Sequence, residues 1–300
     1  MQLITYADDR GPRLGALKDG GYVDLQDAAH ESGQEFPCDM RGLIELGDPG
    51  LDLAEDVIRT SPPRQLSPGS IRPPIPDLRK NVVAVGRNYR EHLEEGARAR
   101  GADPVVPDHA VFFTKPPTAL IGHDMDIELD PRATAELDYE AELVVVVGRR
   151  GRNIAVEDAL EHIFGYTIGN DISARDAQRA HLQWFKGKGM DTFCPIGPCI
   201  VPARYIANPQ DLGICLRVNG ETRQESRTSM MIFDIATIIH QLSIGLTIEP
   251  GDLIMTGTPG GVGLGMDPQR WLADGDMVEA EVDGIGVLRN RVVLVGDLHD

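Results

Sequence analysis

Cysteine, basic residues and long apolar runs are all scarce in this sequence. The four cysteines, Cys38, Cys194, Cys199 and Cys215, form no Cys-x-x-Cys pair and no zinc-ligand spacing. We therefore expect reduced thiols in a cytoplasmic protein, and neither a disulfide scaffold nor a structural zinc site. No apolar run approaches the ~18 residues of a membrane span. Residues 1–6 lack the charged and apolar regions of a secretory leader, so we expect none.

Acidic residues outnumber basic ones by a wide margin. The chain has 29 Lys and Arg against 47 Asp and Glu, a formal net charge of -18. Nucleic acids and anionic membranes bind basic patches, so neither is expected as a partner. A site for an anionic substrate must therefore create its own positive field. We attribute the acidity to solubility, with a salt-rich habitat as the alternative.

The pattern of short strands predicts a β-rich α+β fold. A chain of 300 residues with 41% hydrophobic content can bury one large domain and a small appendage. Predicted strands outnumber helices and mostly connect without crossover helices. A proline-rich stretch suggests a linker, which places a small N-terminal α/β domain at 1–72 and a second, larger domain at 73–300. Helices are predicted at 40–46, 51–59, 89–98, 156–164 and 232–244, and a surface loop at 96–108.

Two glutamates, Glu140 and Glu142, stand at the start of the apolar run 143–147. Residues two apart project from the same side of a strand, so both carboxylates can converge on one point. Asp171 follows a second strand-like segment at 166–168. Three carboxylates without cysteine or paired histidines suit Mg²⁺ or Mn²⁺ before Zn²⁺, with Ca²⁺ as a further option. A solvated acidic strand edge is the alternative.

These acids belong to a longer series of motifs that resembles the fumarylacetoacetate hydrolase family. The motifs follow the family's order across about residues 75 to 295, at positions 86–92, 112–116, 138–142, 169–176, 187–191 and 256–263. The resemblance implies a catalytic domain with a mixed β-sandwich or roll, a metal held by Glu140, Glu142 and Asp171, and a homodimer. It leaves the reaction open, because members include C–C hydrolases, decarboxylases, isomerases and lyases.

His92 and Glu95 lie three residues apart on the predicted helix 89–98, hence on one face. A carboxylate beside an imidazole stabilises its protonated form and fixes its tautomer, which makes the histidine a base toward water. The family uses a His–Glu pair in this motif, which implies the same catalytic role for both residues. The alternative is a solvated helix in which glutamates offset nearby arginines.

Cationic residues further along the chain suit an anionic substrate. The resemblance implies that Arg175 and Gln178 reach the substrate, and a guanidinium can bind a carboxylate through two hydrogen bonds. An ion pair of Arg175 with Asp176 or a nearby glutamate is the alternative. Lys188 stands between two glycines, where the backbone can bend around a ligand. We expect its ammonium to neutralise charge that develops on an oxygen, with Lys186 as the competing candidate.

Residues 256–265 contain five glycines around Thr258. Successive backbone N–H groups in such a loop can form an anion-binding concavity, so Gly257 and Thr258 are predicted to bind substrate. A tight structural turn is the alternative. Lys115 either faces the same pocket or lies on the surface.

Together these residues predict a divalent-metal-dependent hydrolase that cleaves a C–C bond in a 2,4-dioxo acid of the acylpyruvate or fumarylpyruvate type. His92, oriented by Glu95, would deprotonate water. The hydroxide would attack the distal carbonyl and expel a pyruvate-type enolate, whose charge the cation and Lys188 stabilise.

Other readings of the same site stay open. Arg87 and Asn88 stand where larger relatives carry a further metal-binding aspartate, so the chain is most similar to smaller members of acylpyruvate hydrolase or 2-hydroxyhepta-2,4-diene-1,7-dioate isomerase type. An isomerase, decarboxylase or lyase acting on a 2-oxo or 2-hydroxymuconate-type acid could use the same metal. A non-catalytic, metal-stabilised assembly protein is the alternative from another class.

Overall fold

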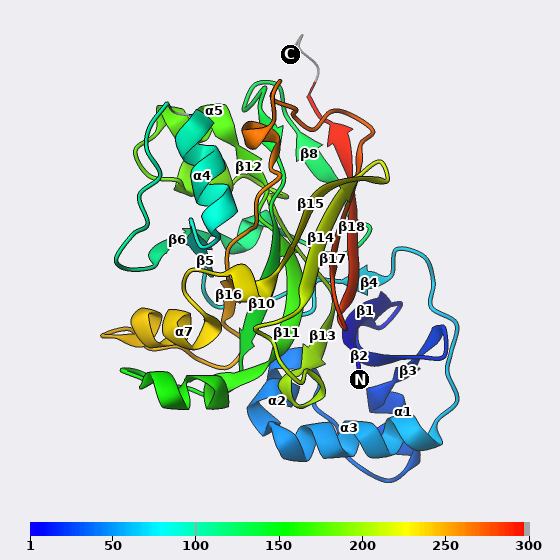
Figure 1. The fold of residues 1–300 in the computed structure, drawn as a ribbon. Helices are drawn as coiled ribbons and strands as arrows, with labels where there is room; N and C mark the ends of the chain where they lie inside the picture. The colour runs from blue at the N-terminus through cyan, green and yellow to red at the C-terminus, as the bar shows by residue number, and fades with distance from the viewer. Residues whose placement is uncertain (100, 297–300) are drawn as a thin grey trace.

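A computed structural model describes residues 1–99 and 101–296 as an α+β fold built on three β-sheets (Figure 1). The largest sheet contains 11 strands: β1 (Leu3–Asp8), β2 (Gly11–Lys18), β3 (Gly21–Asp24), β4 (Ile71–Arg72), β5 (Val82–Gly86), β6 (Val111–Lys115), β7 (Leu120–Ile121), β10 (Ala141–Val147), β11 (Ile163–Asn170), β13 (Cys194–Pro202) and β16 (Leu253–Met255). Its main order is β3-β2-β1-β13-β11-β10-β16-β5-β6. The prediction of a β-rich α+β fold is confirmed.

The two remaining sheets both contribute buried side chains to one hydrophobic core. One contains β8 (Ile127–Leu129), β14 (Gly213–Val218), β15 (Glu221–Arg227), β17 (Met277–Val282) and β18 (Gly286–Leu294), in the order β15-β14-β17-β18-β8. The other pairs β9 (Leu137–Asp138) with β12 (Ser173–Ala174). Alternate residues of β14 and β17 are buried, as expected for strands with one face on the core.

The apolar run of β10 is buried on both faces, because it separates two hydrophobic cores. Leu143, Val145 and Val147 belong to one core, whereas Val144 and Val146 belong to the other. Every residue of β10, β11 and β13 is buried. These strands therefore form a rigid centre, and side chains at their ends are held firmly in place.

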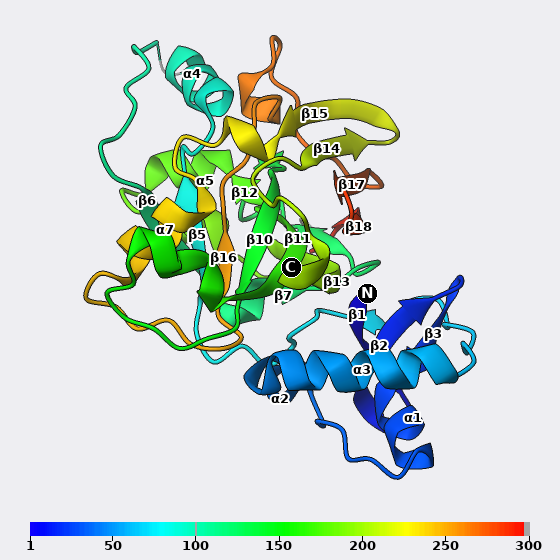
Figure 2. The ribbon, with the colours of Figure 1, turned by 60° about the horizontal axis from the view of Figure 1, so that its bottom comes forward.

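The N-terminal residues form their own layer of strands and helices, seen at the lower right in Figure 2. Its helices are α1 (Leu25–Glu31), α2 (Met40–Leu46) and α3 (Asp48–Thr60). Helix α1 was not predicted; its N-cap Asp24 accepts a hydrogen bond from the Asp27 N–H. Strand β1 pairs with β13, at Leu3 and Ile200. The boundary between two domains at residue 72 stays a prediction. Residues 297–300 of the predicted second domain lie outside the described residues.

The other helices lie outside the central strands, with α4 and α5 above α7 at the left of Figure 1. They are α4 (Arg90–Ala99), α5 (Arg175–Ala180), α6 (Phe185–Lys188), α7 (Ile235–Ser243) and the 3₁₀ turns η1 (Pro117–Ala119), η2 (Val156–His162), η3 (Ala203–Tyr205), η4 (Thr228–Met230) and η5 (Gly263–Gly265). No helix among the described residues is long and apolar enough to cross a membrane.

Two local predictions were wrong. The segment predicted as a helix at 156–164 is the 3₁₀ turn η2, because Ile163 and Phe164 already belong to the buried strand β11. The surface loop predicted at 96–108 begins only after residue 99, because α4 continues to Ala99. Gly96 and Ala97 are buried there and extend the helix's apolar face. Arg100, within that predicted loop, lies outside the described residues.

Asp24 provides a test of the N-terminal layer. Its buried carboxylate accepts hydrogen bonds from Arg13 at 2.7 and 2.8 Å, from the Asp27 N–H at 2.8 Å and from the Tyr6 hydroxyl. Burial opposes its charge, but these hydrogen bonds lower its pKa to about 2. Asp24→Asn should therefore lower the free energy of unfolding by about 2 kcal/mol at pH 7, measured by chemical denaturation.

The difference in unfolding free energy between wild type and Asp24→Asn should become smaller as the pH falls. Because the folded pKa of Asp24 is lowered from 3.8 to about 2, its stabilisation is complete above pH 4 and declines as the pH falls through this interval. The exposed Asp9 supplies the control, and Asp9→Asn should leave stability unchanged. A deficit of Asp24→Asn that is as large at pH 2 as at pH 7 would contradict this assignment.

Candidate active site

Three buried carboxylates meet where β10 and β11 end. Glu142 lies in β10, Glu140 immediately precedes the first residue of β10, and Asp171 directly follows β11. The two strands are antiparallel, with Glu142 opposite Gly169, so these ends adjoin. Glu140, Glu142 and Asp171 are only 4%, 1% and 0% exposed, which rules out a solvated acidic edge. One oxygen from each carboxylate lies within 4.8 Å of the others, so the group can hold a metal ion.

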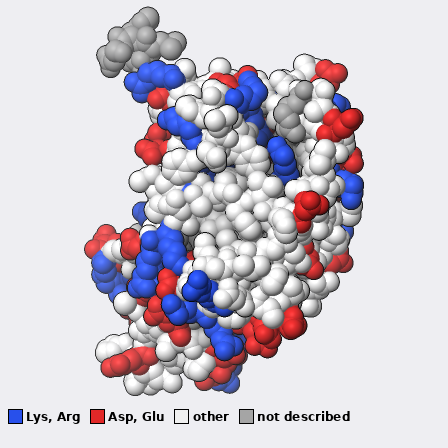
Figure 3. All heavy atoms as spheres, turned by 90° about the vertical axis from the view of Figure 1, so that its left-hand side faces the viewer, with Lys and Arg blue, Asp and Glu red and all other residues white. Residues whose placement is uncertain are grey.

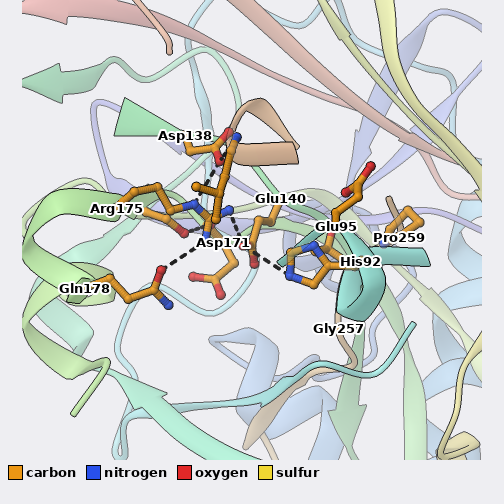
Figure 4. A network of polar contacts seen from close by, with 12 residues as sticks. His92, Glu95, Asp138, Glu140, Asp171, Arg175, Gln178, Gly257 and Pro259 are labelled. Carbon is orange, nitrogen blue, oxygen red and sulfur yellow. Dashed lines mark hydrogen bonds and ion pairs between the residues drawn. The ribbon is translucent and has the colours of Figure 1, made fainter. Parts of the chain in front are cut away.

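Cationic side chains surround two of these carboxylates (Figure 4). The Lys188 ammonium donates to Glu140 Oε2 at 2.8 Å and to Asp171 Oδ2 at 2.7 Å. Lys115 is completely buried and donates to Asp171 Oδ1, so its surface alternative was wrong. The competing Lys186 is exposed and lies away from the carboxylates.

Arg175 makes the structural ion pair that was the alternative to substrate binding, with a glutamate and with Asp138 in place of Asp176. Its Nε donates to Asp138 Oδ2 at 2.8 Å and its Nη2 to Glu140 Oε1 at 2.6 Å. Its Nη1 donates to Gln178 Oε1 at 3.1 Å. Asp176 instead accepts from Thr134 and from backbone N–H groups. A contact of Arg175 or Gln178 with substrate stays a prediction.

The charges around the three carboxylates are unequal. Burial opposes the ionised form of Glu140, but Lys188 and Arg175 hold its pKa well below the usual range. Glu142 accepts one hydrogen bond, from the Gly257 N–H at 2.6 Å, and has no ion pair among the described residues. Burial and the charges of Asp171 and Glu140 raise the pKa of Glu142 well above its usual value. A hard divalent cation bound by oxygen ligands fits this donor set.

His92 lies beside the carboxylates, on α4. Its Nε2 is 3.9 Å from Glu140 Oε1, and burial lowers its pKa to about 4. Glu95 lies on the same helix and accepts from the Gly261 N–H at 2.8 Å. No hydrogen bond joins His92 to Glu95 among the described residues, and both His92 Nδ1 and Glu95 Oε2 are buried without a partner. The catalytic pairing of these residues stays a prediction.

The glycine-rich loop donates its backbone N–H groups to the protein's own carboxylates. Gly257 donates to Glu142, Gly261 to Glu95, and Gly263 and Leu264 to Asp138. Gly257 has a φ of 100°, and a Cβ atom there would lie 2.7 Å from Asn88 Cβ. The loop is therefore a tight structural turn as well as an anion-binding one. Substrate binding by Gly257 and Thr258 stays a prediction.

A cleft of about 510 Å³ opens onto Glu140 and Glu142, two of the three carboxylates. Seven of the predicted site residues line it: His92, Glu140, Glu142, Arg175, Gln178, Lys188 and Thr258. Part of its wall was not predicted, and this part is formed by Arg87, Phe113, Arg179, Trp184 and Gln269. No spacing rule indicated these residues, because they come from segments up to 182 positions apart. On the molecular face in Figure 3, acidic and basic side chains are mixed in the upper and lower parts, and the middle is largely uncharged.

The family model for the fumarylacetoacetate (FAA) hydrolase C-terminal domain matches residues 81–293. The chain belongs to this family of enzymes. It is 45% identical over 227 residues to oxaloacetate tautomerase YisK of Bacillus subtilis, covering 76% of this chain and 74% of that protein. It is 39% identical over 302 residues to the mitochondrial oxaloacetate tautomerase FAHD2A of Bos taurus, covering 98% of this chain and 92% of that protein.

A solved structure supports the same assignment. Fumarylacetoacetate hydrolase from the psychrophilic Exiguobacterium antarcticum superimposes with a TM-score of 0.82 at 36% identity, covering 98% of this chain and 100% of that chain. The predicted family is therefore confirmed. The names of these relatives include tautomerases as well as a hydrolase, so family membership alone does not decide the reaction.

Glu142→Gln tests the metal site and separates metal binding from folding. A glutamine still accepts from the Gly257 N–H but removes a buried charge that has no cationic partner. Titration with Mn²⁺ should show an affinity at least about tenfold below wild type. The metal-free variant should unfold at or above the wild-type temperature, because the raised pKa of Glu142 reports a costly buried charge.

The matched control is Glu94→Gln, which removes an exposed carboxylate from α4. It should bind Mn²⁺ as wild type does. Saturating Mn²⁺ should raise the unfolding temperature of wild type and of the control, and by much less that of Glu142→Gln. Equal Mn²⁺ affinity in all three proteins would remove Glu142 from the metal site.

Proposed function

We propose that this protein is a divalent-metal-dependent tautomerase that interconverts the keto and enol forms of a small 2-oxo dicarboxylic acid of the oxaloacetate class. The observation that carries the proposal is a neutral imidazole, His92, within 4 Å of a buried carboxylate cluster that can hold a cation. The names of the two relatives, one of them aligned with 98% of the chain, support this reaction over the hydrolysis expected from the sequence.

Tautomerisation requires one proton to leave C3 and one to reach the C2 oxygen. A divalent cation bound by Glu140, Glu142 and Asp171 would polarise the 2-oxo group and make the C3 hydrogen more acidic. His92 is neutral at pH 7 because burial lowers its pKa to about 4, so its Nε2 can accept the C3 proton. Glu140, 3.9 Å away, would stabilise the resulting imidazolium, which would then give the same proton to the C2 oxygen of the enolate and so complete the conversion.

Lys188 would stabilise negative charge on the substrate oxygen. Burial opposes its charge, but Asp171 and Glu140 raise its pKa, so the ammonium stays protonated. Charge stabilisation by a fixed ammonium in a buried site requires little reorganisation during reaction. No water enters the reaction and the carbon count is unchanged.

Hydrolysis of a C–C bond in a 2,4-dioxo acid is the second candidate. The two partnerless buried atoms, His92 Nδ1 and Glu95 Oε2, favour it, because a hydrogen bond between these groups would orient His92 to deprotonate water. The structural similarity to a fumarylacetoacetate hydrolase supports the same reaction. In either reaction the proposed substrate is a small anionic oxo acid. We also propose that the protein is a homodimer, as the family resemblance implies.

A panel of oxo acids, assayed with Mg²⁺ and with Mn²⁺, separates the two reactions. A tautomerase should speed the enol–keto interconversion of oxaloacetate, followed by ultraviolet absorbance, and release no carbon fragment detectable by mass spectrometry. Two fragments from an acylpyruvate, with no effect on oxaloacetate interconversion, would instead establish the hydrolase.

His92→Ala should lower the catalysed rate by about 10²-fold or more, since it removes the proposed general base. Its Mn²⁺ affinity should stay close to wild type, because His92 is not among the three carboxylates. His181→Ala removes an exposed histidine outside the cleft and serves as the control. An unchanged rate in His92→Ala would show that another group is the general base.

A further inference from the structure

One cation on the cleft wall has no role in the proposed chemistry. Arg87 lines the cleft, and its guanidinium carbon lies 5.5 Å from the centre of the Trp184 ring. No carboxylate of the described residues lies within 4.0 Å of its guanidinium, whereas Arg175 and Lys188 are each ion-paired with two. The neighbouring Arg179 pairs with Glu136 at 2.7 Å. Arg87 is therefore available to an anionic ligand in the cleft.

The backbone holds Arg87 in an uncommon conformation. Its φ is 58°, in the left-handed region, which is unfavourable for a residue other than glycine. Asn88 fixes the next position by donating to Phe233 O at 3.0 Å and Thr256 O at 2.8 Å. Gly86 packs so closely that a Cβ atom there would lie 2.2 Å from the Trp184 ring. This segment therefore sets the guanidinium against the indole at the cost of local strain.

Aromatic rings link this cation to the metal-binding end of the cleft. The Trp184 and Phe113 rings meet edge to face with centroids 5.4 Å apart. The Lys188 ammonium lies 5.4 Å from the centre of the Phe113 ring, and it donates to Glu140. Arg87 and Lys188 thus mark the two ends of one aromatic wall. Both cations line the same cleft, so an anionic ligand in the cleft can contact either of them.

We propose that Arg87 binds the carboxylate of the substrate that lies farther from the metal, and so selects dicarboxylic over monocarboxylic acids. This inference rests on the proposed function, in which the 2-oxo acid group faces the cation. A guanidinium can bind a carboxylate through two hydrogen bonds, and stacking on an aromatic ring orients it. Arg87 is a specificity-determining residue and takes no part in proton transfer.

Binding of malate and lactate to the Mg²⁺-loaded protein tests this role without turnover. Both are 2-hydroxy acids, and they differ in that malate carries the second carboxylate in place of a hydrogen of the lactate methyl group. By calorimetry, wild type should bind malate more tightly than lactate. Arg87→Gln should weaken malate binding by about 10- to 100-fold, because it removes a hydrogen-bonded charge partner, and leave lactate binding unchanged. Arg87→Lys should retain part of the preference.

Arg90→Gln is the matched control, since it removes one positive charge from an exposed arginine three positions away that does not line the cleft. It should preserve the ratio of malate to lactate affinity. Equal losses for both acids in Arg87→Gln, no loss for either, or a wild-type protein without preference for malate would overturn the proposal.

The proposed function fails separately from this inference. A protein that catalyses no oxaloacetate interconversion, but loses its malate preference in Arg87→Gln, would refute the tautomerase and keep Arg87 as the dicarboxylate-binding residue. A protein that interconverts oxaloacetate, while Arg87→Gln keeps the wild-type ratio of affinities, would keep the tautomerase and refute the role of Arg87.

Discussion

Four carboxylates are buried together with fewer cations than would neutralise them, and the surrounding structure depends on this imbalance of charge. The carboxylates are Asp138, Glu140, Glu142 and Asp171, and the cations are Lys115, Arg175 and Lys188. An unpaired buried charge costs several kcal/mol, so a rigid scaffold must hold the cluster together. Strands β10 and β11 provide it, because they are buried on both faces and end side by side.

The glycine-rich loop compensates for part of the missing positive charge. Its N–H groups donate to Asp138, Glu142 and Glu95, which stabilises these carboxylates without adding cations. The remaining negative charge is concentrated at Glu142, where a divalent cation can neutralise it. In the proposed function, a cation held at this site, together with Lys188 and Arg87 on the cleft wall, would supply the positive charge with which a strongly acidic protein binds an anionic acid.

The sequence predicted the family, the main strands and the three clustered carboxylates. These features follow from local patterns: the alternation along β10 places Glu140 and Glu142 on one side, and an apolar segment leads into Asp171. It could not predict contacts between distant segments. Arg175 was expected to bind substrate, with an ion pair to Asp176 or a nearby glutamate as the alternative, but it pairs with Glu140 and with Asp138, 37 positions earlier. The wall of Arg87 and Trp184 arises from the same kind of long-range packing, and so does the buried position of Lys115.

The most direct measurement is the anomalous difference density of a crystal of this protein grown with Mn²⁺. Binding of the cation by the three carboxylates predicts one strong peak between Glu140, Glu142 and Asp171. Lys188 would then no longer donate to both Glu140 and Asp171, because its ammonium bridges the same two carboxylates. No peak at saturating Mn²⁺, with Lys188 still bridging these residues, would contradict the metal site on which the proposed chemistry depends.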